Sequence, residues 1–215
     1  MRFIIILAIV ALQHFAHAED SLSKCSSHFE LYEKQFDLPK HLLSSVSMTE
    51  TGRWDYNKKS LYSWPWSVNH SGKAYFFESK NEAILFVSNL IQQGHRNIDV
   101  GCMQVNLNYH PSAFENLYQA FDPKHNIAYA ASLIKKHYLN SASWVSAIAR
   151  YHSGEKSRGI QYANKVLKIW QKHSTSPSND STQTKFSRKI FRTPSRNPIR
   201  YKNDNSSYRK VIGQT

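Results

Sequence analysis

Glu50 is the residue whose position first suggests acid–base chemistry. It follows Val46 by four residues and Leu43 by seven, so it continues the apolar face of a helix expected over residues 39–50. A carboxyl group on that face is partly removed from water, which raises its pKa and makes it a candidate proton donor near neutral pH. The alternative is an ordinary helix-end glutamate that turns to solvent or pairs with Arg53.

Two later segments carry side chains that could hold a polar substrate. In residues 101–104, a glycine lets the backbone approach a ligand closely and a glutamine offers both a donor and an acceptor. Residues 149–154 place a tyrosine and a histidine at the expected end of a helix. Each segment alone has an ordinary interpretation, with Met103 as a core residue, Gln104 as a solvated side chain and Tyr151 as a packed aromatic.

The cysteine and histidine content gives no metal signature. The chain has two cysteines and eleven histidines, and none of them forms an H-x-x-x-H or C-x-x-C unit. We therefore expect neither a metal ion nor an organic cofactor at the site.

The N-terminus has the pattern of a secretory signal peptide. Arg2 precedes an apolar run over residues 3–12, and an Ala-His-Ala sequence at residues 16–18 matches a cleavage site. The run is too short to span a bilayer as a helix. We expect a signal peptide over residues 1–18 and an exported mature chain from Glu19, located in the periplasm, in the cell envelope or outside the cell.

Both cysteines, Cys25 and Cys102, lie in the part of the chain expected to be exported. An oxidising compartment favours a disulfide bond over free thiols. Cys25 shares a helical face with Phe29, Tyr32 and Phe36, so its side chain should point inward. We expect a Cys25–Cys102 bridge, and the alternative is a pair of buried, unpaired thiols.

Positive charge is concentrated near the C-terminus. Residues 19–173 carry 18 basic and 13 acidic side chains, whereas residues 174–215 carry 9 and 2. The second segment is rich in Ser, Asn and Pro and has no helical or alternating period, so we expect one domain at 19–173 and a disordered basic tail at 174–215. Basic residues interspersed with Phe186, Phe191 and Tyr201 could hold an anionic polymer, namely cell-wall glycan, a lipid surface or nucleic acid. A solvating extension without a specific partner explains the tail equally well.

The remaining pattern predicts a mostly helical α+β domain with one small sheet. Residues 62–78 hold two aromatic and β-branched runs around Asn69-His70-Ser71-Gly72, which predicts a hairpin. Ser79 and Glu82 form a capping box, and Gly52 is expected to end a helix as a left-handed cap. Apolar residues recur at helical spacing in residues 22–36, 39–50, 79–94, 123–139, 143–153 and 157–172.

Taken together, the three polar segments resemble the motifs of one family. Residues 50–52 (ETG), 101–104 (GCMQ) and 149–154 (ARYHSG) are similar, in order, to E-S/T-G, G-x-M-Q and A-Y-N-x-G of the goose-type lysozyme-like lytic transglycosylases, the SLT-domain family. The resemblance covers residues 22–172, and three motifs in this order are fairly specific. It implies a lysozyme-like fold and peptidoglycan glycan strands as the substrate.

The resemblance also implies a role for each matched residue. Glu50 takes the position of the family's single catalytic acid, and Thr51 stands where the family often has serine. Gln104 matches a glutamine that lines the sugar-binding groove, with Met103 packed beneath it. Tyr151 matches the groove tyrosine near the catalytic carboxyl group.

The third motif departs from the family pattern. His152 stands in place of the family's asparagine, and Arg150 also differs from the commonest form, so the polar contact of that asparagine does not transfer directly. We keep His152 among the candidate substrate-binding residues. The aromatic residues at 64–66 and 75–77 have no counterpart in the motifs, and they either stack on sugar rings or fill the core.

The family's reaction suits a site with one carboxyl group. Ordinary glycosidases need two, whereas Asp55 and Asp99 have no obvious place on the buried face and are interpreted as turn or capping residues. In the reaction that the resemblance implies, the acid protonates the oxygen between MurNAc and GlcNAc. The same group then takes the proton of the MurNAc 6-hydroxyl, which attacks the anomeric carbon and gives a 1,6-anhydro product without consuming water.

Three other functions remain open. A true lysozyme would hydrolyse the same bond, with Asp55 or Asp99 across the groove from Glu50 as a second carboxylate. A glycan-binding or assembly protein would keep the fold without turnover. Nucleic-acid binding through the tail rests on charge alone, and the signal peptide argues against it. The resemblance is compatible with local wall opening at a secretion or conjugation apparatus and with general wall turnover.

Overall fold

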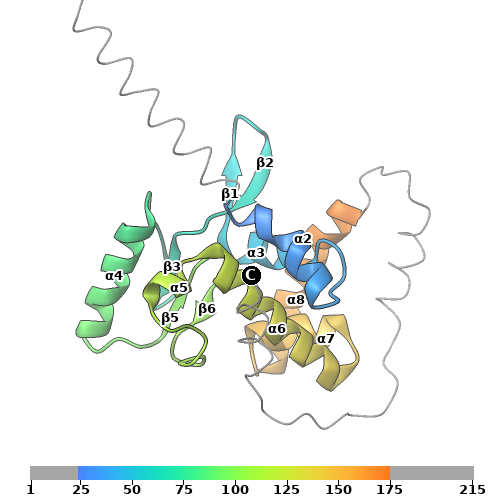
Figure 1. The fold of residues 1–215 in the computed structure, drawn as a ribbon. Helices are drawn as coiled ribbons and strands as arrows, with labels where there is room; N and C mark the ends of the chain where they lie inside the picture. Colours follow the sequence, from blue (N-terminus) through green and yellow to red (C-terminus); the bar gives the residue numbers. More distant parts are fainter. Residues whose placement is uncertain (1–23, 175–215) are drawn as a thin grey trace, which may run out of the picture. The chain divides into compact units, whose positions relative to one another are not determined.

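The computed structural model describes residues 24–174 (Figure 1). The predicted signal peptide and, apart from Ser174, the predicted basic tail lie outside the described residues. The described part divides into two compact units. We call residues 24–28 and 51–126 the strand unit, and residues 29–50 and 127–174 the helical unit. The domain limits at 19 and 173 stay predictions.

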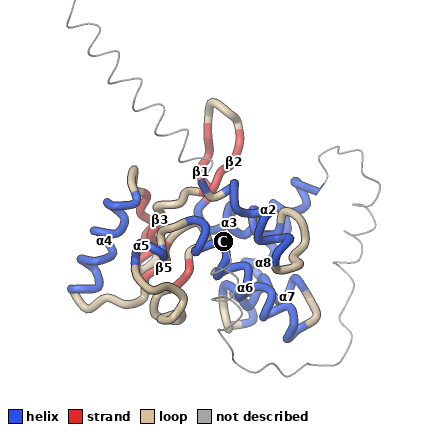
Figure 2. Tube along the Cα trace, viewed as in Figure 1, coloured by secondary structure: helices blue, strands red, loops and turns tan. Residues whose placement is uncertain are grey.

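Helices predominate, which confirms the predicted α+β class, and the strands form two small antiparallel sheets instead of the single sheet predicted (Figure 2). The helices are α2 (Ser26–Gln35), α3 (Leu42–Thr51), α4 (Lys80–Gln92), α5 (Leu117–Ala120), α6 (Pro123–Ser141), α7 (Trp144–His152) and α8 (Lys156–Ser174). The strands are β1 (Gly52–Asp55), β2 (Ser60–Ser63), β3 (Ser67–His70), β4 (Lys73–Phe76), β5 (Ile98–Val100) and β6 (Val105–Asn106). Within residues 24–174, no helix combines the length and the apolar character that a membrane crossing requires.

The larger sheet of the strand unit has the order β4-β3-β5-β6. In its register Val68 lies opposite both Tyr75 of β4 and Val100 of β5. The β3–β4 hairpin is the predicted one, because Ser71 and Gly72 form its turn with φ angles of 53° and 78°. Two successive residues with positive φ match the right-handed twist of the strands they join.

The hairpin of β1 and β2 corrects one sequence prediction. Gly52 is the first residue of β1 and pairs with Ser63, so it continues the chain as a strand instead of capping α3. The carbonyl of Thr51 accepts a hydrogen bond of 3.3 Å from the backbone N–H of Trp64, which follows β2. The last carbonyl of α3 therefore accepts its hydrogen bond from the residue that follows the hairpin. A left-handed glycine is not needed to satisfy it.

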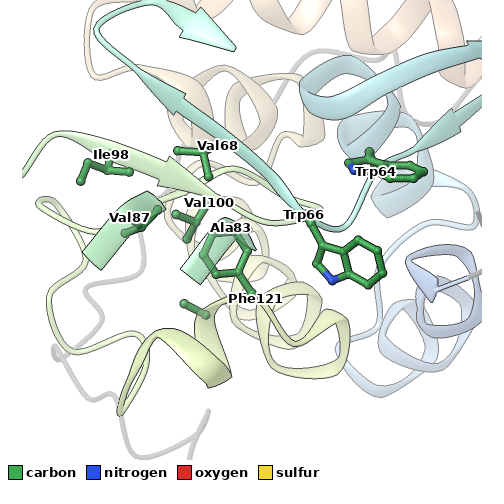
Figure 3. Close-up of a cluster of buried hydrophobic side chains, with 9 residues drawn as sticks. Trp64, Trp66, Val68, Ala83, Val87, Ile98, Val100 and Phe121 are labelled. Carbon is green, nitrogen blue, oxygen red and sulfur yellow. The ribbon is translucent and has the colours of Figure 1, made fainter. Parts of the chain in front are cut away.

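The core of the strand unit joins the larger sheet to α4 (Figure 3). Aliphatic side chains of β3, β5 and α4 pack together with the buried rings of Trp64 and Trp66 and with Phe121. The indole N–H of Trp64 donates to the carbonyl of Phe77 at 2.8 Å, which gives this buried polar atom a partner. The tryptophans at 64 and 66 therefore fill the core, which is one of the two roles that the sequence left open.

The start of α4 and the disulfide bond both agree with the sequence predictions. Ser79 is the N-cap of α4 and accepts a hydrogen bond of 3.2 Å from the N–H of Glu82, as the predicted capping box requires. The predicted bridge between Cys25 and Cys102 is also confirmed. It ties the segment that leads into α2 to the loop between β5 and β6, and both sulfur-bearing side chains are fully buried.

In the helical unit, Glu33 of α2 caps the start of α3. Its carboxyl oxygens accept hydrogen bonds from the N–H groups of His41 at 2.9 Å and Leu43 at 2.8 Å. His41 has a φ of 65°, and this turn delays α3 to Leu42, three residues after the predicted start. Burial raises the pKa of Glu33 to about 7, although the hydrogen bonds from the backbone act in the opposite direction.

Helices α7 and α8 of the helical unit approach each other closely at Gly159. A Cβ atom at this position would lie 2.8 Å from the carbonyl oxygen of Ala149, so a larger residue would separate the two helices. Near the other end of α8, the indole N–H of Trp170 donates to the carbonyl of Lys40 at 2.9 Å. These contacts place one face of α8 against α7 and the segment before α3.

Candidate active site

Glu50 lies in the last turn of α3, half-buried, and its carboxyl group meets a tyrosine of α8. The hydroxyl of Tyr162 donates a hydrogen bond of 2.6 Å to Glu50 Oε1. Tyr162 is 5% exposed, and it lies on the buried face of α8 with Val166 and Trp170 at four-residue spacing. The sequence interpretation missed Tyr162. The signal was its position on this face, since a buried tyrosine hydroxyl needs a polar partner.

Tyr162 remains a hydrogen-bond donor over the whole physiological pH range. Its pKa lies well above the usual value of 10, because burial disfavours the phenolate. The neighbouring Glu50, Tyr151 and the hydrogen bond to Glu50 raise it further. A neutral phenol held against a carboxyl group suits a site in which that group changes its protonation state during the reaction.

The end of α7 contributes the two other predicted residues of the helical unit. His152 stacks on Tyr162 with ring centroids 4.2 Å apart and planes inclined by 3°. Tyr151 lies close enough to Tyr162 to affect its pKa. Burial, followed by the charges of Lys165 and Arg158, lowers the pKa of His152. Tyr151 and His152 lie 101 and 102 residues after Glu50 in the sequence. The fold therefore brings all three residues together around Tyr162.

Gln104 of the strand unit has one half of its amide group fixed by the fold. Its side-chain nitrogen donates to the carbonyl of Gly101 at 3.1 Å and to the carbonyl and hydroxyl oxygens of Ser67, both at 3.2 Å. Two of these acceptors are carbonyls, so the nitrogen must face them and the side-chain oxygen must face away. Among the described residues, the structure gives that oxygen no donor.

Gly101 starts the loop that carries the second motif, and only glycine fits there. Its φ is 79°, and a Cβ atom would lie 2.5 Å from the side-chain nitrogen of Asn126. Asn126 is fully buried, donates to the carbonyls of Val100 and Ala120, and accepts a bond of 2.9 Å from the N–H of Met103. The sequence interpretation also missed Asn126, which lies in the polar first turn of α6, just before the apolar run at residues 127–131.

Thr51 and Met103 are buried within the strand unit. The hydroxyl of Thr51 donates to the carbonyl of Cys102 at 3.2 Å and accepts from the N–H of Trp64 at 3.3 Å. Met103 has no exposed surface in the described structure. The structure thus places Thr51, Cys102 and Met103 in one buried network behind the motif, with Gln104 as its partly exposed member. Their proposed contacts with a glycan stay predictions.

The two aspartates that could have acted as a second carboxylate are held by their own neighbours. Asp55 accepts hydrogen bonds from the N–H groups of Asn57 and Lys58, so it is the turn residue that the sequence predicts. Asp99 is not, because it lies within β5, and its carboxylate accepts a bond of 2.7 Å from the side chain of Asn106. Burial raises the pKa of Asp99, and this bond acts against that shift.

Metal ligands do not gather anywhere in residues 24–174, where no group of three or more His, Cys, Asp or Glu side chains could hold an ion.

The chain matches a known protein family. The sequence model of the family described as the Transglycosylase SLT domain matches residues 29–168, which is more than half of the 215-residue chain. The match includes all three motif segments. Comparisons with curated proteins and with solved structures gave no significant match.

Proposed function

The chain belongs to the transglycosylase SLT domain family, and on that premise we propose that it is a lytic transglycosylase with Glu50 as its catalytic acid. Membership in the family implies peptidoglycan as the substrate and a place of action outside the cytoplasm. The finer proposal is that the chain cleaves the MurNAc-β-1,4-GlcNAc bond without water and leaves 1,6-anhydro-MurNAc ends.

The observation that carries this proposal is the hydrogen bond from Tyr162 to Glu50. In the proposed reaction Glu50 first gives its proton to the glycosidic oxygen and then, as a carboxylate, takes the proton of the MurNAc 6-hydroxyl. A buried phenol that stays protonated can donate to Oε1 in both states, so this contact supports the carboxyl group both when it gives a proton and when it takes one. A single carboxyl group can therefore serve as acid and base in turn.

The remaining predicted residues receive supporting parts in this proposal. Gln104 offers its unpartnered side-chain oxygen to a sugar hydroxyl or acetamido N–H, and Tyr151 offers its ring or hydroxyl to the glycan. Thr51 and Met103 hold the loop that presents Gln104. The held carboxylates of Asp55 and Asp99 favour the transglycosylase over a two-carboxylate lysozyme.

We place the enzyme in the periplasm or cell envelope, where it would open the wall locally for a secretion or conjugation apparatus. The predicted signal peptide supports export. The basic tail at 174–215 has 9 basic and 2 acidic residues. We propose that it binds an anionic polymer or the partner complex.

The test is mass spectrometry of the products that residues 19–215 release from purified peptidoglycan, with Glu50→Gln alongside. Anhydro-MurNAc ends from the wild type, reduced by about 10²–10⁴-fold in the variant, are the expected result. Reducing MurNAc ends would instead identify a hydrolytic lysozyme. Binding without products from either protein would identify a glycan-binding or assembly protein.

A further inference from the structure

Three side chains of the helical unit stand in series at the candidate site. The imidazole of His152 lies parallel to the ring of Tyr162, with centroids 4.2 Å apart, and the hydroxyl of Tyr162 reaches Glu50 Oε1 at 2.6 Å. They come from α7, α8 and α3, so the stack connects three helices through one phenol ring. His152 makes no hydrogen bond to Glu50 that would give it a direct part in the proton transfer.

The direction of the Tyr162 hydroxyl depends on how its ring is held. The hydroxyl oxygen lies in the ring plane at the far end of the side chain, and the last torsion of a tyrosine has a broad energy minimum. A parallel ring packed over one face restricts tilting of the phenol and so keeps the oxygen on Glu50. Asparagine, which the family motif has at this position, has no ring and cannot form this stack.

We propose that His152 is a positioning residue for the catalytic acid, acting through the ring of Tyr162, and that its protonation lowers activity on the acid side. The inference rests on the proposed role of Glu50. It assigns to His152 a task different from the substrate contact that the motif suggests, and it explains how this chain works without the asparagine.

The charged groups around His152 set the direction of the pH effect. Lys165 and Arg158 of α8 face it, Arg158 is paired with Glu155, and Glu50 and Tyr151 face the Tyr162 ring. Because the pKa of His152 is lowered, the ring is neutral at neutral pH. Burial and these two cations disfavour the charged imidazolium where the ring lies, so protonation of His152 weakens its stack on Tyr162. The phenol is then held less firmly against Glu50, so activity falls as pH drops.

The experiment measures kcat and KM on purified peptidoglycan from pH 4 to 8 for the full exported chain, residues 19–215. The variants are His152→Asn, which restores the family residue, and His152→Phe, which keeps a ring but cannot titrate. His95→Asn, an exposed histidine of the strand unit, is the matched control. We expect His152→Asn to lower kcat about tenfold with KM changed less than twofold. His152→Phe should lower kcat at neutral pH less than His152→Asn does, and it should lose the acid limb of the profile.

A wild-type kcat in His152→Asn, or an unchanged acid limb in His152→Phe, would overturn the inference. The stack itself is tested without activity, by the NMR signal of the His152 ring proton on Cε1. Its upfield displacement by the phenol should disappear in Tyr162→Leu, and absence of that displacement in the wild type would also overturn the inference. A wild type that releases no product would instead overturn the proposed function, so the two failures are distinguishable.

Discussion

The two units hold their candidate functional residues by different chemistry. In the strand unit the second motif is fixed by a disulfide and by neutral amide and hydroxyl groups, chiefly Asn126, Gln104 and Thr51. In the helical unit the corresponding contacts involve titratable groups, namely the capping carboxyl of Glu33 and the pair of Glu50 and Tyr162. The strand unit should therefore respond mainly to redox conditions, and the helical unit mainly to pH.

One residue limits this contrast. Asp99 is a partly buried carboxyl group of the strand unit, and burial raises its pKa, so this unit also has a titratable group. Its bond to Asn106 opposes the shift. Asp99 therefore adds a pH-dependent contact to a unit whose other contacts at the motif are neutral.

The largest expected effect is loss of the disulfide through Cys25→Ser. The bond closes a loop over 77 residues of sequence separation, and the chain-entropy model gives about 4–5 kcal/mol for its contribution to stability. Urea unfolding of the wild type with and without reductant, compared with the variant, measures this. The variant should lose stability and no longer respond to reductant. An unchanged midpoint would show that the strand unit does not depend on the bridge.

Glu33→Gln should change how stability depends on pH in the helical unit. The folded pKa of Glu33, about 7, lies above its ordinary value of 4.5, so ionisation is disfavoured in the folded state. Its contribution to stability is therefore complete below pH 4.5 and declines as pH rises through 7, by about 3 kcal/mol in total. The variant cannot ionise and should show a flatter profile between pH 4.5 and 7.5. Equal slopes in the two proteins would contradict this assignment.

Tyr162→Phe should lower activity with little change in substrate affinity. The variant keeps the ring and the stack with His152 but removes the donor to Glu50 Oε1. A hydrogen bond to a charged group contributes about 1.5–3 kcal/mol, which corresponds to a fall of about 10–100-fold in kcat. Steady-state kinetics on peptidoglycan would measure it, with circular dichroism to confirm the fold. A loss confined to KM would place Tyr162 in glycan binding instead.

The smallest effect is expected for Gln104→Met, which keeps the length of the side chain and removes its polar atoms. Under the proposed function the variant loses an acceptor for the glycan, worth about 1 kcal/mol, so KM should rise about fivefold while kcat stays within twofold. Ser67 is the matched control, because Ser67→Ala removes one partner of the Gln104 nitrogen and leaves its outward oxygen in place. If both variants raise KM equally, the oxygen of Gln104 has no part in binding.

Local features of the fold could be predicted from the sequence because their signals lie within a few residues. The Ser79 cap and the turn at Ser71 and Gly72 follow from side-chain capping and positive φ, and Ser143 caps the start of α7 in the same way as Ser79 caps α4. Periodicity was less reliable for single positions. Ile160, one of the apolar residues at helical spacing in the predicted helix at 157–172, is 45% exposed, because the contact face of α8 passes through Gly159, Tyr162 and Val166 instead.

The candidate site required information from distant parts of the chain. Glu50 could be chosen as the acid from its place on an apolar stripe and from the motif, but its partner Tyr162 lies 112 residues later. Asn126 supports Met103 across 23 residues, and no local pattern marks it as the buried centre of that network. The strand that begins at Gly52 was missed for a related reason, because its partner strand has no strong β signal and is half exposed.

The Cys25–Cys102 bridge also fixes an order of events in the life of the chain. A polypeptide is made from its N-terminus, and Cys102 follows Cys25 at a sequence separation of 77, which takes about 4–15 s at about 5–20 residues per second. Until then Cys25 has no partner within its own chain. Because the chain contains just these two cysteines, an incorrect bridge within one molecule cannot form. The competing product of oxidation is a covalent dimer of two incompletely synthesised molecules. The yield of active protein should therefore fall as the concentration of such chains during export rises.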